Sequence, residues 1–235
     1  MVNGYFLIAD LLGFGAIIRN LDGNARAIRI AGWLSLVDKS ARACSIEQIQ
    51  LISDTVFAGT GDDQDGLIRL VRFAQTLLNQ GIEQALPIRG AICHGEYSWG
   101  RLTYGPVVVS AHELEMSQNW VGVACQSNLP RTDSLWGLGS LICYPAPLKA
   151  GVVGLRPVVD WSVPVSQKFA AALCREGLTR EGETLDWSFA EKLNNTLLFA
   201  AYRDVIARGE NDPRNFYGLV PIEAISAYLD STRVI

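Results

Sequence analysis

The feature that most constrains the fold is an alternation of short apolar segments with helical ones up to about residue 125. Runs such as GYFLIAD (4–10) and WVGVAC (120–125) have the length and composition of buried strands. The segments between such runs repeat apolar residues at helical spacing, as Leu67, Val71 and Leu78 do. Strands are therefore expected at 4–10, 48–60 (two, joined at Ser53-Asp54), 86–95, 96–104 and 120–125, and helices at about 16–40, 63–80 and 106–118.

This order, β-α-β-β-α-β-β-α-β, predicts an α+β (α/β) fold. The expected architecture is a ferredoxin-like core with extra strands, in which an antiparallel-rich sheet carries its helices on one face. Within that core, Asp22-Gly23 is expected to interrupt the first helix, and Gly81 is expected to end the second.

The second half of the chain is less regular. Residues 127–160 are rich in Pro, Gly and Ser, and no pattern places them. Helical patterns resume near 166–176 and 188–208. We therefore expect a domain over residues 1–160 and a C-terminal helical extension over 161–235 that packs on it.

Composition excludes several classes of protein. Hydrophobic residues make up 49% of the 235 residues and the net charge is −4, which allows a sizeable core and gives no basic surface for nucleic acid or an anionic membrane. The start of the chain lacks the basic n-region of a signal peptide, and no apolar run approaches the ~20 residues of a membrane span. Five scattered cysteines without a C-x-x-C pair indicate free thiols rather than disulfides or a zinc knuckle. A cytoplasmic location is expected.

Two acidic residues are the strongest candidates for chemistry. Asp10 and Asp54 each follow a hydrophobic segment, FLIA and QLIS, at a point where the chain turns. Carboxylates at the ends of neighbouring strands would converge and could bind Mg²⁺ or Mn²⁺ through oxygen atoms. The alternative is structural: Asp10 would cap the following helix and Asp54 would stabilise a hairpin turn.

Other candidates are less specific. The turn Asp10-Leu-Leu-Gly-Phe-Gly15 could direct backbone N–H groups at a phosphate, although it is not a P-loop. Arg89 and Arg101 could each reach a triphosphate or make a structural ion pair. Neither His94 nor His112 is expected to be catalytic, because a strand would place Cys93 and His94 on opposite faces.

Taken together, four segments resemble the motifs of the class III nucleotidyl cyclase family. They are ADLLGFG, SDTVFAGTG, PIRGAICHGE and YGPVVVSAHELE, within about residues 4–125. The resemblance implies a catalytic domain in which Asp10, Asp54 and the Leu11 carbonyl hold two Mn²⁺ or Mg²⁺ ions. It also implies that the backbone of Leu12, Gly13 and Phe14 binds the substrate's phosphates, and that two copies form a homodimer with shared active sites.

Three positions depart from the family pattern. The transition-state Asn and Arg are replaced by Val109 and Glu113, and the purine-selecting Lys is replaced by Gln50. With the Ala-His-Glu-Leu-Glu form of the helix, this combination resembles the Pycsar branch, whose members make cyclic pyrimidine nucleotides in antiphage defence. The resemblance implies a uridylate cyclase that converts UTP to 3′,5′-cyclic UMP and pyrophosphate and signals to a separate cyclic-nucleotide-sensing effector.

These departures require other residues for base recognition and for the missing positive charge. Gln50 is the candidate for the base pocket, and Arg89 and Arg101 are the candidates for the missing cation. Three alternatives remain open: a cytidylate cyclase, a purine cyclase with an unusual base pocket, and a catalytically dead cyclase fold that binds a nucleotide and acts as a regulator.

Overall fold

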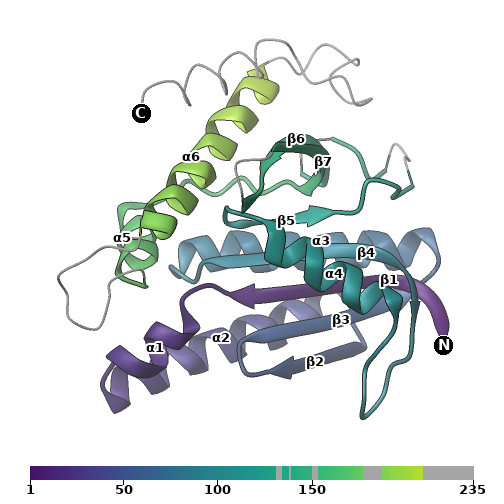
Figure 1. Ribbon diagram of the computed structural model, residues 1–235, viewed down its shortest axis with the longest axis horizontal. Coiled ribbons are helices and arrows are strands. Elements are labelled where there is room, and N and C mark those ends of the chain that lie inside the picture. The colour runs from purple at the N-terminus through teal and green to yellow at the C-terminus, as the bar shows by residue number, and fades with distance from the viewer. Residues whose placement is uncertain (131–133, 138, 150–152, 177–186, 209–235) are drawn as a thin grey trace.

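Seven strands form one sheet in the part of the chain that the structure describes (Figure 1). The structure is a computed structural model that describes residues 1–130, 134–137, 139–149, 153–176 and 187–208. The strands are β1 (Val2–Leu11), β2 (Gln48–Ile52), β3 (Thr55–Gly61), β4 (Ile88–Tyr97), β5 (Gly122–Cys125), β6 (Leu141–Pro147) and β7 (Val153–Val159). The helices are α1 (Phe14–Asn20), α2 (Gly23–Ala43), α3 (Gln64–Glu83), α4 (Pro106–Ser117), α5 (Gln167–Glu176) and α6 (Trp187–Arg208).

The sheet is mostly antiparallel, and β1 lies near its centre. The strand order is β2-β3-β1-β4-β5-β7-β6, and only the β4–β5 pair among these neighbours is parallel. Asp10 is paired with Thr55 of β3 on one side and with Arg89 of β4 on the other. The expected α+β fold with an antiparallel-rich sheet is confirmed.

Helices cover both faces of the sheet, so the expectation that they lie on one face is wrong in this detail. Tyr5 and Leu7 of β1 belong to the large core under α2 and α3, whereas Phe6 and Ile8 pack in a second cluster with Val107 of α4. Figure 1 shows α4 in front of the sheet and α2 and α3 behind it. The physical reason is that alternate side chains of a strand point to opposite faces, and β1 is apolar on both.

Two helix boundaries depend on single residues. The carboxylate of Asp22 accepts a hydrogen bond from the Ala25 N–H at 2.8 Å and separates α1 from α2, as the sequence predicted. The expected end of α3 at Gly81 is wrong, because α3 continues to Glu83. Gly81 is buried against the next turn: a β-carbon there would lie 2.7 Å from the Leu86 carbonyl oxygen. This glycine therefore permits a close approach and does not end the helix.

The segment 96–104 is not an antiparallel partner strand of β4, in contrast to the prediction. Strand β4 continues to Tyr97, and Ser98 and Tyr104 then form an isolated bridge through two backbone hydrogen bonds of 2.8 and 3.2 Å. β1 occupies one edge of β4 along its length, and β5 occupies the other edge from Arg89 to Ile92. The chain therefore forms a hairpin over 98–104 that is not a strand of the sheet (Figure 1).

The C-terminal segments pack on the β5–β7–β6 end of the sheet. Strands β6 and β7 come from the region that no sequence pattern placed, whereas α5 and α6 lie where helices were expected. Phe199 and Tyr202 of α6 belong to the same hydrophobic core as Trp120 and Tyr144. The domain boundary expected at residue 160 falls directly after β7, and residues 209–235 of the expected extension lie outside the described residues.

Two smaller expectations also have structural outcomes. Among the described cysteines, Cys44, Cys93, Cys125 and Cys143 form no disulfide, and Cys93 and Cys125 are buried. Of the helices that the structure describes, none has both the length and the apolar character that a membrane span needs.

Candidate active site

Asp10 lies at the C-terminal end of β1, on the face of the sheet that α4 covers. It shares this face with Ile8, because both have even positions in the strand. Its carboxylate accepts a hydrogen bond of 3.2 Å from the Thr55 hydroxyl. The cap of α1 is Gly13 and involves no side-chain hydrogen bond, so the alternative in which Asp10 caps that helix is wrong.

The structure brings Asp54 to Asp10, as the sequence predicted. Asp54 lies in the tight turn between β2 and β3, directly after Ser53, whose φ of 61° places it in the left-handed region. The Asp54 carboxyl lies close enough to that of Asp10 to raise its pKa. The pKa of Asp10 is raised to about 7: burial is the largest cause, the negative charges of Asp54 and Glu115 also raise it, and Arg89 acts in the opposite direction. Such paired carboxyls share a proton at neutral pH or bind a cation in its place.

The donor atoms at this pair suit Mg²⁺ or Mn²⁺. Asp10 and Asp54 supply carboxylate oxygens, and backbone alternation along β1 directs the Leu11 carbonyl to the β3 edge, where Asp54 lies. No group of three or more His, Cys, Asp or Glu side chains able to hold a metal occurs among the described residues. Two carboxylates and a carbonyl fit a magnesium-type ion, which keeps waters and binds substrate phosphates, better than a zinc ion.

The turn after Asp10 offers fewer phosphate donors than expected. The Leu12 N–H donates to the Pro87 carbonyl at 2.9 Å, so Leu12 cannot bind a phosphate through this group. Gly13 has a φ of 80°, and in the described part of the chain neither its N–H nor that of Phe14 has an acceptor. Of the three expected backbone donors, Gly13 and Phe14 therefore stay available.

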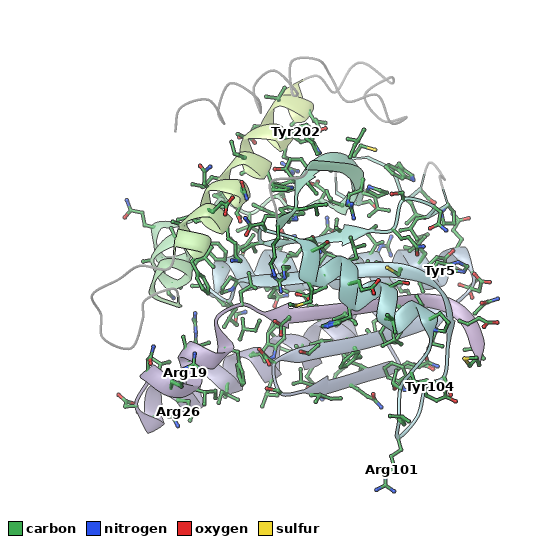
Figure 2. The ribbon with its side chains drawn as sticks, in the orientation of Figure 1. Tyr5, Arg19, Arg26, Arg101, Tyr104 and Tyr202 are labelled. Carbon is green, nitrogen blue, oxygen red and sulfur yellow. The ribbon has the colours of Figure 1, made fainter. Side chains whose placement is uncertain are left out.

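Arg19 is a cation beside this turn that the sequence did not indicate. Figure 2 shows Arg19 on α1, the helix that follows the turn. Its guanidinium folds back on Gly15: a β-carbon at Gly15 would lie 3.1 Å from Arg19 Nη1.

Arg89 lies next to Asp10 but is committed to a buried ion pair. Its Nε donates to the Glu115 carboxylate at 2.5 Å, and both side chains are almost fully buried. Its Nη1 donates to the Gln118 carbonyl at 3.3 Å. The structure thus places Arg89 at the candidate site and also gives it the structural ion pair that was considered as the alternative.

Arg101 is separated from the other candidate residues. It lies at the tip of the 98–104 hairpin and points away from the sheet (Figure 2). The prediction that it follows on a strand beside Arg89 is wrong, because this segment forms no strand.

Gln50 lies on the same face of the sheet as Asp10, but its side-chain amide is occupied. Register pairs Gln50 with Phe57, and Phe57 with Ile8. The Gln50 Nε2 donates to the Gly100 carbonyl at 2.6 Å, and the Oε1 accepts from the Thr103 hydroxyl at 2.9 Å. Gln50 therefore fixes the hairpin to β2.

Lys149 is a further cation that sequence reasoning missed. Burial lowers the pKa of this lysine, the charge of Arg89 lowers it further, and Glu115 acts in the opposite direction. Lys149 therefore lies close to the Arg89–Glu115 pair. The residue is in the segment 127–160, where no sequence signal pointed to it.

The positions that carry Asn and Arg in the resembled family are exposed on α4. Val109 has 57% of its surface exposed, and Glu113 is also exposed. Neither side chain can donate a hydrogen bond to a phosphate. The histidines lie apart from the carboxylate pair: His112 is exposed on α4, and His94, which pairs with Tyr5 near the N-terminal end of β1, bonds Asp62 at 2.5 Å.

Comparisons with known proteins give a consistent fold. No protein-family model matches the chain, and no curated protein matches it in sequence. Two solved structures have a TM-score of 0.50 to it, and each covers 67% of this chain and 94% of its own. One is the catalytic core of a rhodopsin-guanylyl cyclase with converted specificity in complex with ATPalphaS, at 18% identity. The other is the adenylyl cyclase CyaB from P. aeruginosa, at 17% identity. The chain has the class III nucleotidyl cyclase fold.

Proposed function

We propose that this protein is a nucleotidyl cyclase whose active site is built on Asp10 and Asp54. The observation that carries the proposal is the pairing of these two carboxyl groups at the end of a central strand. The raised pKa of Asp10, to about 7, indicates a site whose negative charge a cation would relieve. The class III cyclase fold supports the same reading.

The reaction is an intramolecular displacement. The ribose 3′ hydroxyl releases its proton to solvent, its oxygen forms a bond to the α-phosphorus, and the bond from that phosphorus to the bridging oxygen of pyrophosphate breaks. Asp10, Asp54 and the Leu11 carbonyl would hold two Mn²⁺ or Mg²⁺ ions, which when bound lower the pKa of the attacking hydroxyl and neutralise the triphosphate. The free N–H groups of Gly13 and Phe14 would orient the terminal phosphates.

Cations from the chain would balance the charge that develops on the leaving pyrophosphate. Arg89 lies beside the carboxylate pair and Lys149 lies near Arg89 and Glu115, whereas Arg101 lies too far out on its hairpin to contribute within one chain. Electrostatic stabilisation of this kind is the largest contribution that a site without covalent chemistry can make.

We propose UTP as the substrate and 3′,5′-cyclic UMP as the product, with CTP as the alternative. This finer assignment rests on the sequence resemblance to the Pycsar branch and on Gln50 in place of a purine-selecting lysine. Antiphage signalling to a separate effector in the cytoplasm is proposed on the same resemblance.

We also propose a head-to-tail homodimer with two shared sites. Exposed apolar side chains support it: Leu102 and Tyr104 of the hairpin and Val109 and Met116 of α4 have 44–72% of their surface exposed. A second copy that covers this surface would bury it. Analytical ultracentrifugation of an active sample tests the dimer, and a monomer that retains full activity would contradict it.

A second candidate function is a regulator that binds a nucleotide without turnover. Val109 and Glu113 on the exposed face of α4 favour it, because neither replaces the donors that a transition state needs. The retained pair of aspartates argues against it.

The deciding experiment incubates the purified chain with Mn²⁺ and each of ATP, GTP, CTP and UTP, and identifies products by mass spectrometry. Cyclic UMP is expected from UTP, and Asp10→Asn and Asp54→Asn are expected to abolish it. Cyclic CMP alone would assign the alternative substrate, and a purine product would refute the pyrimidine assignment. Binding without any cyclic product would favour the regulator.

A further inference from the structure

Helix α6 contacts the segment that joins α4 to β5, and that segment holds Arg89. Residues 118–121 leave α4 and have not yet entered the sheet, so their backbone groups need other partners. The Asn119 N–H donates to the Pro147 carbonyl at 3.0 Å. The Asn119 carbonyl and the Val121 N–H bond to side chains of α6.

Two neighbouring residues of α6 make these contacts. The Asn195 Nδ2 donates to the Asn119 carbonyl at 2.7 Å. The Thr196 hydroxyl accepts from the Val121 N–H at 3.0 Å and donates to the Lys192 carbonyl at 2.6 Å. Both side chains are buried, and Thr196 has no exposed surface. A buried polar contact fixes geometry more strictly than apolar packing, because each lost partner leaves an unsatisfied group.

Gln118 connects this segment to the candidate site. Its side-chain Nε2 donates to the Gly90 carbonyl at 2.7 Å, and its Oε1 accepts from the Trp120 indole at 3.0 Å. Its own carbonyl accepts the 3.3 Å hydrogen bond from Arg89. Gln118 is fully buried, and it bonds both the Arg89 side chain and the carbonyl of Gly90, the next residue of β4. In the backbone register of β1 and β4, Arg89 lies directly opposite Asp10.

We propose that Asn195 and Thr196 are positioning residues for the Asp10–Arg89 site: they fix Asn119–Val121, and through Gln118 they fix the place of Arg89. The inference rests on the proposed cyclase function for its effect on turnover, although the physical connection from α6 to β4 does not. Helix α6 is then a part of the catalytic structure rather than an appendage.

The test compares two substitutions on α6 that each remove a side-chain hydroxyl bonded to backbone: Thr196→Val loses the bonds to Val121 and Lys192, and Tyr202→Phe loses the bond to Cys143. Thr196→Val removes the acceptor of the Val121 N–H. Tyr202→Phe is the matched control, because it removes the 2.6 Å bond to the Cys143 carbonyl of β6 and leaves the hydrogen bonds of the 118–121 segment in place. Asn195→Ala serves as a milder second variant should Thr196→Val fail to fold, and Thr196→Ser restores the hydroxyl.

Hydrogen exchange monitored by mass spectrometry gives a readout that needs no turnover. Thr196→Val is expected to raise exchange about tenfold at Val121 and also in β4 around Arg89, whereas Tyr202→Phe raises it in β6 alone. An increase confined to α6 and Val121, with β4 unchanged, would overturn the proposal.

Turnover gives the second readout. We expect Thr196→Val to lower kcat about tenfold with the nucleotide KM within about twofold, since a shifted Arg89 loses an interaction made in the transition state. Thr196→Ser should recover the rate, and Tyr202→Phe should keep it. Equal losses of kcat in Thr196→Val and Tyr202→Phe would overturn the proposal. If the wild-type chain forms no cyclic product, the proposed function fails and the exchange data alone decide the positioning role.

Discussion

Replacing Asp10 with Asn should stabilise the metal-free protein, and the gain should depend on pH. The pKa of this carboxyl is raised from 3.8 to about 7, and each pKa unit corresponds to about 1.4 kcal/mol. The ionised form thus destabilises the fold by at most about 4 kcal/mol. Because Asp10 is partly exposed and is coupled to Asp54, we expect Asp10→Asn to recover about half, roughly 2 kcal/mol, at pH 8.

The direction of the pH dependence follows from the raised pKa. The folded protein retains a proton that the unfolded chain releases near pH 4, so the stabilisation from that proton is complete below about pH 4 and is lost as the pH rises through about 7. Asp10→Asn should therefore equal the wild type near pH 4 and exceed it at pH 8. For a chain of this size, 2 kcal/mol corresponds to a rise of about 4–8 °C in Tm.

Thermal and urea unfolding at pH 4, 6 and 8, without metal, measure the effect. Asp38→Asn is the control, because Asp38 is 58% exposed beside Arg42 and its charge should change stability by less than about 0.5 kcal/mol. Added Mn²⁺ should stabilise the wild type and leave Asp10→Asn unchanged. A gain at pH 8 that persists at pH 4, or no gain at all, would refute the reasoning about a charged, crowded carboxylate pair.

Two further predictions concern the surroundings of the site. Glu115→Gln leaves the buried Arg89 without its countercharge, so we expect a loss of about 3 kcal/mol in the free energy of urea unfolding; a loss below about 1 kcal/mol would indicate that the pair is solvated. Gln50→Leu removes both side-chain hydrogen bonds that fix the 98–104 hairpin, so trypsin should cleave after the exposed Arg101 several-fold faster. An unchanged cleavage rate would show that Gln50 does not hold the hairpin.

Local patterns in the sequence were enough for the central part of the fold. The apolar run FLIA predicted β1, and the position of Asp10 and Asp54 at chain turns predicted that they meet. The same run could also have predicted which faces of the sheet are covered. Its residues are apolar without alternation, which indicates burial on both faces and therefore a helix on each side of the sheet.

Side-chain partners far apart in sequence could not be predicted. Arg89 and Glu115 are 26 positions apart, and their pairing depends on which face of β4 meets α4. Gln50 was the candidate for the base pocket, but its amide bonds Gly100 and Thr103, which lie about 50 positions away in the sequence. Lys149 follows β6, whose Pro145 and Pro147 are typical of a loop. β6 is an edge strand of the sheet. Prolines, which have no N–H to donate, are tolerated there because one side of the strand faces no other strand.

The most direct test of the cyclase assignment is the stoichiometry of products formed from UTP in Mn²⁺ by the wild type, Asp10→Asn and Asp54→Asn. Cyclic UMP and pyrophosphate are expected in equal amounts from the wild type, and neither is expected from the two variants. Release of UMP in place of cyclic UMP would contradict the assignment by showing hydrolysis instead of cyclisation. Undiminished cyclic UMP from either variant would show that the reaction takes place elsewhere than at the paired aspartates.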